Sequence, residues 1–155
     1  MNPENYPKPS CEKIKEILTA EQYSVTQLCD TEIPFTGEYN NNNRPGLYVD
    51  IVTGEPLFSS ANKYNSGSGW PSFTQPINPD VVVKHTDNSY GMSRVSLSSR
   101  IGNSHLGHVF EDGPVSRGGQ RYCINSLSLR FIPYEEMEEE GYGEFMPLCE
   151  VYGGG

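Results

Sequence analysis

The stretch that decides the fold runs from 94 to 132 and reads RVSLSSRIGNSHLGHVFEDGPVSRGGQRYCINSLSLRFI. It contains short runs of β-branched, aromatic or alternating apolar residues, and clusters of Gly, Asn, Ser and Asp separate these runs. Such runs are typical of strands, and such clusters are typical of turns. With two similar runs upstream, the expected strands are 47–52, 81–85, 94–97, 108–110 and 121–132. Short strands with glycine-rich connections predict a mainly β protein, built as a sandwich or an open barrel.

Short helices are expected on both sides of this β-rich region. Apolar residues recur at helical spacing in CEKIKEIL (11–18), and Ser10 precedes them as a candidate helix start. Thr19 and Gln22 fit a capping box that opens a second helix through Val25 and Leu28. Near the end of the chain, YEEMEEE lies between a proline and a glycine and predicts a short acidic helix.

Length and charge exclude several classes of protein. The chain has 155 residues, which fits one domain. Its net charge of −9 argues against a nucleic-acid partner, because such affinity comes mainly from Lys and Arg that neutralise phosphates. The longest aliphatic run, 81–83, is far too short for a membrane span, so no membrane partner is expected either.

Cysteine usage indicates a reducing compartment. The four cysteines are Cys11, Cys29, Cys123 and Cys149, and none of them belongs to a C-x-x-C pair. Neither a disulfide scaffold nor a structural zinc site is therefore expected. Residues 1–30 also show no recognisable secretion signal. We expect a cytoplasmic protein whose cysteines either perform thiol chemistry or lie buried and inert.

Three polar side chains share one face of the last expected strand. In RYCINSLSLRF (121–131), alternation places Arg121, Cys123 and Asn125 on the same face. A guanidinium two residues from a thiol favours the thiolate, which is the nucleophilic form. Cys123 is therefore a candidate nucleophile, and the alternative is an inert cysteine of the core.

Two histidines lie close together in SHLGHVFEDGP (104–114). On a regular strand His105 and His108 point to opposite faces, but a bulge at Gly107 would bring both to one side. Two histidines beside a thiol can polarise a substrate oxygen or supply protons near neutral pH. The alternative is a pair of half-exposed loop histidines.

The single tryptophan lies in the loop GSGWPSF (67–73). Aromatic side chains that Gly and Pro hold in a loop commonly form the wall of a pocket for an apolar group. Trp70 is therefore a candidate binding residue, and the alternative is a plug at one end of the sandwich.

These three motifs, in this order and spacing, closely resemble the methionine sulfoxide reductase B family, from about Tyr23 to Tyr142. The resemblance implies two antiparallel sheets and reduction of the R epimer of methionine sulfoxide, free or in proteins. It implies no cofactor, and it implies a thioredoxin-like reductant that resets the enzyme by thiol–disulfide exchange. Such an enzyme repairs proteins after oxidative stress.

The resemblance also assigns roles to the candidate residues. Cys123 is the nucleophile and becomes a sulfenic acid when methionine departs. Arg121 helps to set the thiolate, and Asp112 or Glu111 orients the cluster. Contact with the sulfoxide oxygen or its bridging water is assigned to His105, His108 and Asn125. Binding of the substrate methyl group is assigned to Trp70 with Phe110.

Two departures from the family pattern concern sulfur. The positions that match the two zinc-binding C-x-x-C pairs of other members are Asp50, Thr53, Ser99 and Gly102. The zinc site is therefore expected to be absent. Many zinc-free members have their resolving cysteine immediately before the Gly-Trp of GWPSF, where this chain has Ser68.

Another thiol must then resolve the sulfenic acid, or an external thiol reduces it directly, or Ser68 is an engineered replacement. Our candidate for the resolving thiol is Cys29, at an expected helix-to-loop junction, with Cys149 in the tail as the reserve. Cys11 lies outside the matched region. A disulfide requires the two Cα atoms to lie within about 7 Å.

The expected organisation is an N-terminal extension or linker-like helix (1–18), a catalytic domain (19–145) and a flexible tail (146–155). The chain is expected to be a monomer, or one domain of a fused reductase. Two other functions stay open. One is a Cys-His-Asn acyl hydrolase, for which Asn125 is poorly placed behind a histidine. The other is an acidic β interaction module with a buried, inert Cys123.

Overall fold

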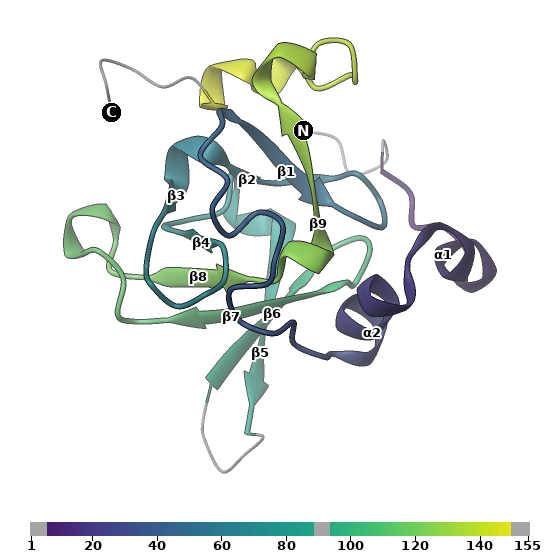
Figure 1. Ribbon diagram of the computed structural model, residues 1–155, viewed down its shortest axis with the longest axis horizontal. Helices are drawn as coiled ribbons and strands as arrows, with labels where there is room; N and C mark the ends of the chain where they lie inside the picture. Colours follow the sequence, from purple (N-terminus) through teal and green to yellow (C-terminus); the bar gives the residue numbers. More distant parts are fainter. Residues whose placement is uncertain (1–5, 89–93, 150–155) are drawn as a thin grey trace.

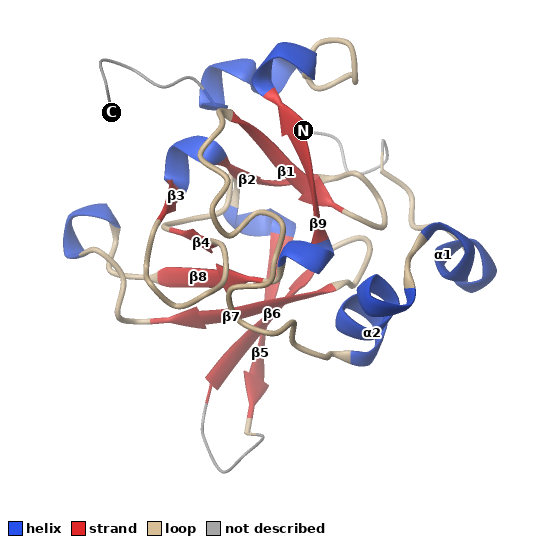
Figure 2. Ribbon diagram, in the orientation of Figure 1, coloured by secondary structure: helices blue, strands red, loops and turns tan. Residues whose placement is uncertain are grey.

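The protein is seen in a computed structural model that describes residues 6–88 and 94–149. Within these residues the fold is mainly β, with two antiparallel sheets and a few short helices (Figures 1 and 2). One sheet has the strand order β2–β1–β9, and the other has the order β3–β4–β8–β7–β6–β5. The predicted fold class is therefore confirmed.

The three-stranded sheet consists of β1 (Gly46–Asp50), β2 (Pro56–Ser59) and β9 (Leu129–Pro133). The six-stranded sheet consists of β3 (Lys63–Tyr64), β4 (Ser72–Phe73), β5 (Val82–Asp87), β6 (Arg94–Ser99), β7 (His105–Phe110) and β8 (Arg121–Ile124). Each expected strand before residue 121 has a counterpart here, with boundaries that differ by a few residues.

The two helices at the start of the chain follow their caps. The first, α1 (Cys11–Ile17), begins after Ser10, whose hydroxyl accepts a hydrogen bond from the backbone N–H of Lys13. The second, α2 (Ala20–Leu28), has the predicted capping box, in which Thr19 and Gln22 satisfy each other's backbone N–H groups. Both helices lie on the same side of the sheets in Figure 1, and α2 contacts β7.

Short 3-10 helices fill the connections. They are η2 (Ser60–Asn62), η3 (Pro79–Val81), η5 (Val115–Arg117), η6 (Ser126–Ser128), η7 (Tyr134–Glu136) and η8 (Gly143–Cys149). The predicted acidic helix over 134–140 is reduced to the single turn η7, followed by hydrogen-bonded turns that end at Gly141. A run of glutamates offers this segment few apolar contacts that would extend the helix.

The prediction of one long strand over 121–132 is wrong. The segment leaves the six-stranded sheet after Ile124, turns through η6 and enters the three-stranded sheet as β9. Side-chain alternation cannot continue across this turn, so Leu129 and Phe131 do not extend the face that carries Cys123. At the break, the side chains of Asn125 and Ser126 accept hydrogen bonds from the backbone of the distant 30–39 segment.

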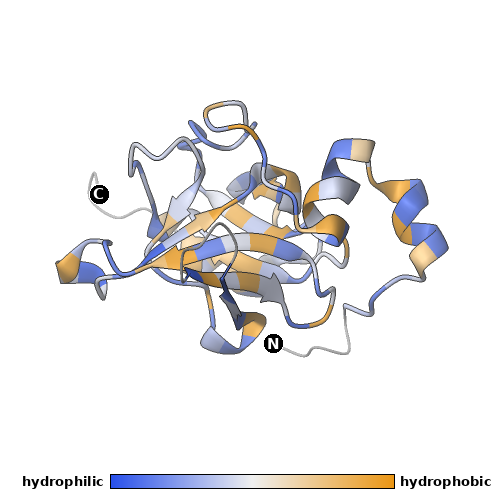
Figure 3. Ribbon diagram, turned by 90° about the horizontal axis from the view of Figure 1, so that it is seen from below, coloured by the Kyte–Doolittle hydropathy of each residue, from blue (hydrophilic) through white to orange (hydrophobic). Residues whose placement is uncertain are grey.

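The main core lies between the two sheets. Large buried side chains from both sheets meet there, and the rings of Phe58 and Phe73 stack with centroids 4.5 Å apart. Figure 3 shows the apolar residues in orange along the central strands. A second cluster, which includes Val49, Ile132 and Phe145, covers the other face of the three-stranded sheet. The core therefore fixes β7 and β8, which carry the candidate site, from behind.

The expected flexible tail differs from the structure in its first part. Residues 146–149 belong to η8, and Cys149 is buried in the second cluster. The rest of the expected tail, 150–155, lies outside the described residues. The described helices are all too short or too polar to cross a bilayer.

Candidate active site

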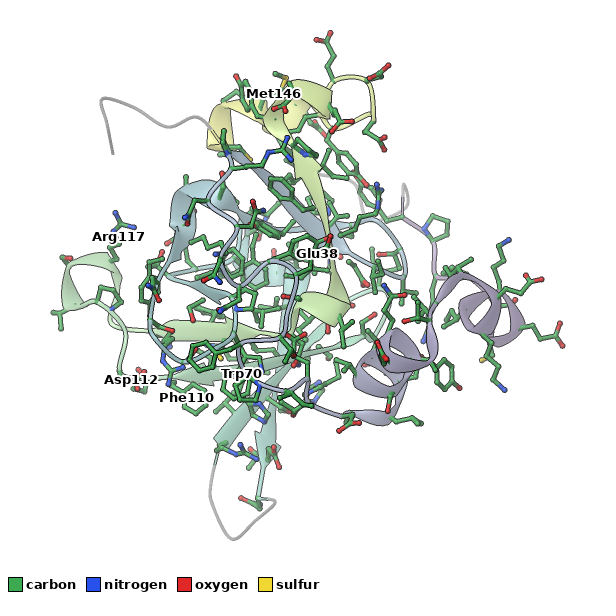
Figure 4. All side chains as sticks on the ribbon, in the orientation of Figure 1. Glu38, Trp70, Phe110, Asp112, Arg117 and Met146 are labelled. Atoms are coloured by element: carbon green, nitrogen blue, oxygen red, sulfur yellow. The ribbon has the colours of Figure 1, made fainter. Side chains whose placement is uncertain are left out.

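The candidate site is a pocket of about 200 Å³ at the strands β7 and β8. In the antiparallel register, Cys123 of β8 lies directly opposite His108 of β7 and opposite Ser72 of β4. Directly paired residues project to the same face of a sheet. Figure 4 shows Trp70, Phe110 and Asp112 on the lower side of these strands in that view, and Arg117 farther out. The pocket is lined by Thr31, Ser68, Trp70, Arg94, Gly107, His108, Phe110, Arg121, Cys123 and Asn125.

The Cys123 thiol is partly buried and lies beside the polar side chains of Ser68 and Arg121. Its Sγ lies 3.8 Å from Oγ of Ser68, which occupies the position of the resolving cysteine in many zinc-free members of the family that the sequence resembles. Burial raises the pKa of this thiol above its ordinary value, while the Ser68 hydroxyl and the Arg121 guanidinium lower it. Arg121 thus acts in the direction expected from the sequence, but burial is the larger effect.

Arg121 is held by a carboxylate and an aromatic ring. Its Nε and Nη2 donate hydrogen bonds of 2.9 and 3.1 Å to the two oxygens of Asp112, and its guanidinium lies 4.4 Å from the Phe110 ring centroid. Glu111 instead accepts a hydrogen bond from Gln120. Of the two acids considered from the sequence, Asp112 is therefore the one that orients Arg121.

A bulge brings the two histidines to one side. The pairing of β6 with β7 shifts register at Leu106, and the rings of His105 and His108 lie 5.7 Å apart. The glycine between them permits a close approach of strands, because a Cβ at Gly107 would collide with the Cys123 carbonyl oxygen. The expected bulge is therefore present, and it also explains why this position is glycine.

The two histidines differ in environment. Burial lowers the pKa of His105 to about 4, and its Nε2 has no hydrogen-bond partner among the described residues. His108 lines the pocket, and its Nε2 lies 2.8 Å from a carboxylate oxygen of Asp87. Asp87, which also lies 3.5 Å from Arg94, was not singled out from the sequence. No short sequence motif could have identified Asp87, because it lies 21 residues from His108 and on a strand that β6 separates from β7.

Asn125 lines the pocket, but both ends of its amide are engaged. Its Oδ1 accepts a hydrogen bond from the backbone N–H of Glu32, and its Nδ2 donates one to the carbonyl of Leu106. The residue therefore ties the 30–39 segment to β7. Asn125 therefore holds parts of the pocket together. Its expected contact with the sulfoxide oxygen stays a prediction.

Glu32 is a second residue that sequence reasoning missed. Its carbonyl accepts a hydrogen bond from the Trp70 indole N–H at 3.0 Å, and its Oε1 accepts one from the backbone N–H of Leu127. Burial raises the pKa of its carboxyl. Trp70 is thus fixed at its polar edge while its ring lines the pocket. A lone acid in a loop has no recognisable pattern, so only the fold could reveal it.

The other cysteines lie outside the pocket lining. Cys149, considered from the sequence as a mobile reserve thiol, is buried behind the three-stranded sheet. Cys29 is exposed at the C-terminal end of α2, two residues before Thr31 of the pocket. Cys11 is exposed on α1.

The four positions that the resemblance matches to zinc ligands do come together. The buried carboxylate of Asp50 accepts hydrogen bonds from the Ser99 hydroxyl at 2.6 Å and the Ser104 hydroxyl at 3.0 Å. A side chain at Gly102 would meet Asp50 and Thr53. Burial raises the pKa of Asp50. Hydrogen bonds thus join these loops, and the described residues contain no group of three or more His, Cys, Asp or Glu that could bind a metal.

The comparison with known families gives one match. A family model described as SelR domain matches residues 18–133. The match covers well over half of the chain and contains every residue that lines the pocket. The motifs indicated a resemblance from about Tyr23 to Tyr142, so the match begins slightly earlier and also ends earlier than expected.

Proposed function

We propose that this chain, which belongs to the SelR domain family of methionine-R-sulfoxide reductases B, performs its reduction through the Cys123 thiol. Members of this family are peptide-methionine (R)-S-oxide reductases, and so is this protein. The observation that carries the proposal is a pocket whose lining includes Cys123, two aromatic side chains and a histidine that is paired with Cys123 across the strands and bound to a carboxylate.

The proposed reaction transfers one oxygen atom. The Cys123 thiolate attacks the sulfoxide sulfur while the sulfoxide oxygen gains a proton, which makes that sulfur electrophilic. The S–O bond of the substrate breaks, and an S–O bond to Cys123 forms. Methionine sulfur thereby gains the two electrons that Cys123 loses, and Cys123 is left as a sulfenic acid.

The aromatic side chains supply the binding site for the apolar end of the substrate. Trp70 and Phe110 both line the pocket, and its volume of about 200 Å³ suits a small group such as a methyl sulfoxide. The indole is anchored at Glu32, and Phe110 lies under the Arg121 guanidinium. The pocket therefore presents a preorganised apolar wall to the substrate methyl group.

His108 is the better candidate for the proton donor. The pKa of about 4 leaves His105 uncharged near neutral pH, so His105 can offer a hydrogen bond but no readily transferred charge. The Nε2 of His108 is held by Asp87, which leaves its Nδ1 for the sulfoxide oxygen. The Asp87 carboxylate also fixes the orientation of the ring, in the way that a carboxylate orients a catalytic histidine elsewhere.

Recycling is assigned to Cys29 and then to a thioredoxin-like reductant. Support comes from Thr31, which lines the pocket, because two residues span at most about 7 Å and Cys29 therefore lies within that distance of Thr31. Ser68 cannot form a disulfide, and Cys149 would have to leave a core. Thiolate attack of Cys29 on the sulfenic acid releases water and forms a disulfide that an external dithiol reduces.

A single-turnover experiment tests these assignments. Wild-type enzyme receives one equivalent of a methionine-R-sulfoxide peptide without reductant, and the S epimer serves as the control. We expect one methionine per enzyme and a Cys29–Cys123 disulfide in the peptide map. Cys123→Ser should form no methionine, whereas Cys29→Ser should still form methionine and leave a sulfenic acid that a 1,3-diketone traps.

The outcomes separate the two parts of the proposal. Methionine formation by Cys123→Ser would exclude Cys123 as the nucleophile. Normal recycling of Cys29→Ser with a thioredoxin would show that the sulfenic acid is reduced directly, with Ser68 as its hydrogen-bonding neighbour. An acyl hydrolase is disfavoured because the Asn125 amide is bound to two backbone groups instead of a histidine.

A further inference from the structure

A second and larger hollow adjoins the active-site pocket. Its volume is about 700 Å³, and it lies between α2, the 30–39 segment and the turn η6. Thr31 lines both the hollow and the active-site pocket, and Asn125 of the pocket is followed directly by Ser126 of the hollow. A peptide that places a methionine sulfoxide in the pocket can therefore continue into the hollow.

The hollow is lined by acidic side chains and by a group of apolar side chains, which we call its apolar base. Its carboxylates are those of Glu21, Asp30, Glu32 and Glu38, and none of the described residues that line it is basic. Its apolar part is formed by Val25, Ile51, Leu127 and Leu129. We call this feature the acidic hollow.

One of these carboxylates is built into the wall. Glu32 is 6% exposed, and its Oε1 accepts a hydrogen bond from the Leu127 backbone. Its other oxygen, Oε2, is buried beside Gly37 and the Ser126 hydroxyl, and it makes no hydrogen bond of good geometry in the part of the chain that the structure describes. A buried acceptor without a partner is costly, and a cationic donor entering the hollow would satisfy it.

We propose that the acidic hollow binds a lysine or arginine that lies near the oxidised methionine in the substrate polypeptide. The aliphatic stem of such a residue can lie on the apolar base while its charged end meets the carboxylates. The net charge of −9 attracts the same substrates at longer range. The proposal rests on the proposed function only in that the methionine sulfoxide occupies the Cys123 pocket.

The test compares peptides that differ in one charge. Each peptide has capped ends and a central methionine-R-sulfoxide, with lysine or glutamine placed in turn at each flanking position. N-acetylmethionine-R-sulfoxide amide, which has no flanking residue, reports the basal reaction. We expect the best lysine peptide to exceed its glutamine partner in kcat/KM by about threefold to tenfold, mainly through KM. This preference should shrink at high ionic strength.

Two double variants locate the effect. Glu21→Gln with Glu38→Gln removes two exposed carboxylates of the hollow, and neither residue lines the active-site pocket. Glu136→Gln with Glu139→Gln removes the same charge from an exposed turn beyond β9. We expect the first variant to lose the lysine preference and the second to keep it, while both turn over the small substrate normally.

Several outcomes would overturn the proposal. Equal kcat/KM for lysine and glutamine peptides at every position would show that the hollow does not bind cations. An equal loss in both double variants would assign the preference to net charge alone. Failure of the proposed function gives a different result, since Cys123→Ser would then still turn over the small substrate.

Discussion

The contact between Asp87 and His108 gives the sharpest prediction about catalysis. The Asp87 carboxylate lies 2.8 Å from Nε2 of His108, and the two side chains are 23% and 14% exposed. A hydrogen bond to a charged group is worth about 1.5–3 kcal/mol when it is this protected. If it acts mainly when the ring gains charge, its loss slows the reaction by about 10- to 150-fold.

Two substitutions divide this effect into charge and acceptor. Asp87→Asn keeps the size of the side chain and can still accept a hydrogen bond, but it removes the negative charge. Asp87→Ala removes both. We expect kcat to fall in both variants, more strongly in Asp87→Ala, with KM for N-acetylmethionine-R-sulfoxide nearly unchanged. The measurement is steady-state kinetics with the R epimer over a range of pH.

The matched control lies on the same strands. His85 and Ser98 form a 2.8 Å hydrogen bond between β5 and β6 outside the pocket lining, so Ser98→Ala removes a comparable contact without touching His108. Arg94→Gln tests the neighbouring ion pair of Asp87 at 3.5 Å. A wild-type kcat and pH profile in Asp87→Ala, with an intact fold, would refute the role of Asp87 in positioning His108.

Three further changes test the electrostatics and the packing. Arg121→Gln should raise the pKa of Cys123 further, because it removes a positive charge, and the pH profile of Cys123 alkylation should move upward; an unmoved profile would contradict this. Gly107→Ala should lower the free energy of unfolding by about 1–3 kcal/mol or more in denaturant unfolding, because the added methyl group meets the Cys123 carbonyl. The control is Gly118→Ala, which has open space around it and should cost only its backbone strain of about 1–2 kcal/mol. Asp50→Asn tests a buried carboxyl whose raised folded pKa supports stability below the unfolded pKa and loses that support as pH rises through the folded value. The variant should therefore flatten the decline in unfolding free energy that begins at the unfolded pKa of about 4 and ends at the raised folded value, and an unchanged decline would exclude Asp50 as its source.

Local signals in the sequence were enough for the fold class and for the family. The capping residues Ser10 and Thr19 specify the two helices, because each cap bonds backbone groups only three residues away. The alternating runs likewise predict strands without knowledge of their partners. The motifs around Trp70, His108 and Cys123 indicate the family, since each keeps its chemical groups close together in the chain.

The sequence failed where a residue's role depends on a distant part of the chain. The segment 121–132 alternates like one strand, yet Asn125 and Ser126 turn it from one sheet to the other because their side chains hold the 30–39 segment. Periodicity reports only which face a residue can occupy within one element. It does not report where two sheets exchange a chain.

The amino-acid sequence alone identifies a thiol, two histidines and a tryptophan in motifs of one family. Only the folded chain brings them together with the residues that hold them in position. Glu32 contacts Asn125 and Trp70 across 93 and 38 residues, and Asp87 reaches His108 over an intervening strand. Contacts at such separations leave no short spacing in the sequence that a motif can record. They form only when the core brings the distant segments together, because closing such long loops costs entropy that the core must offset.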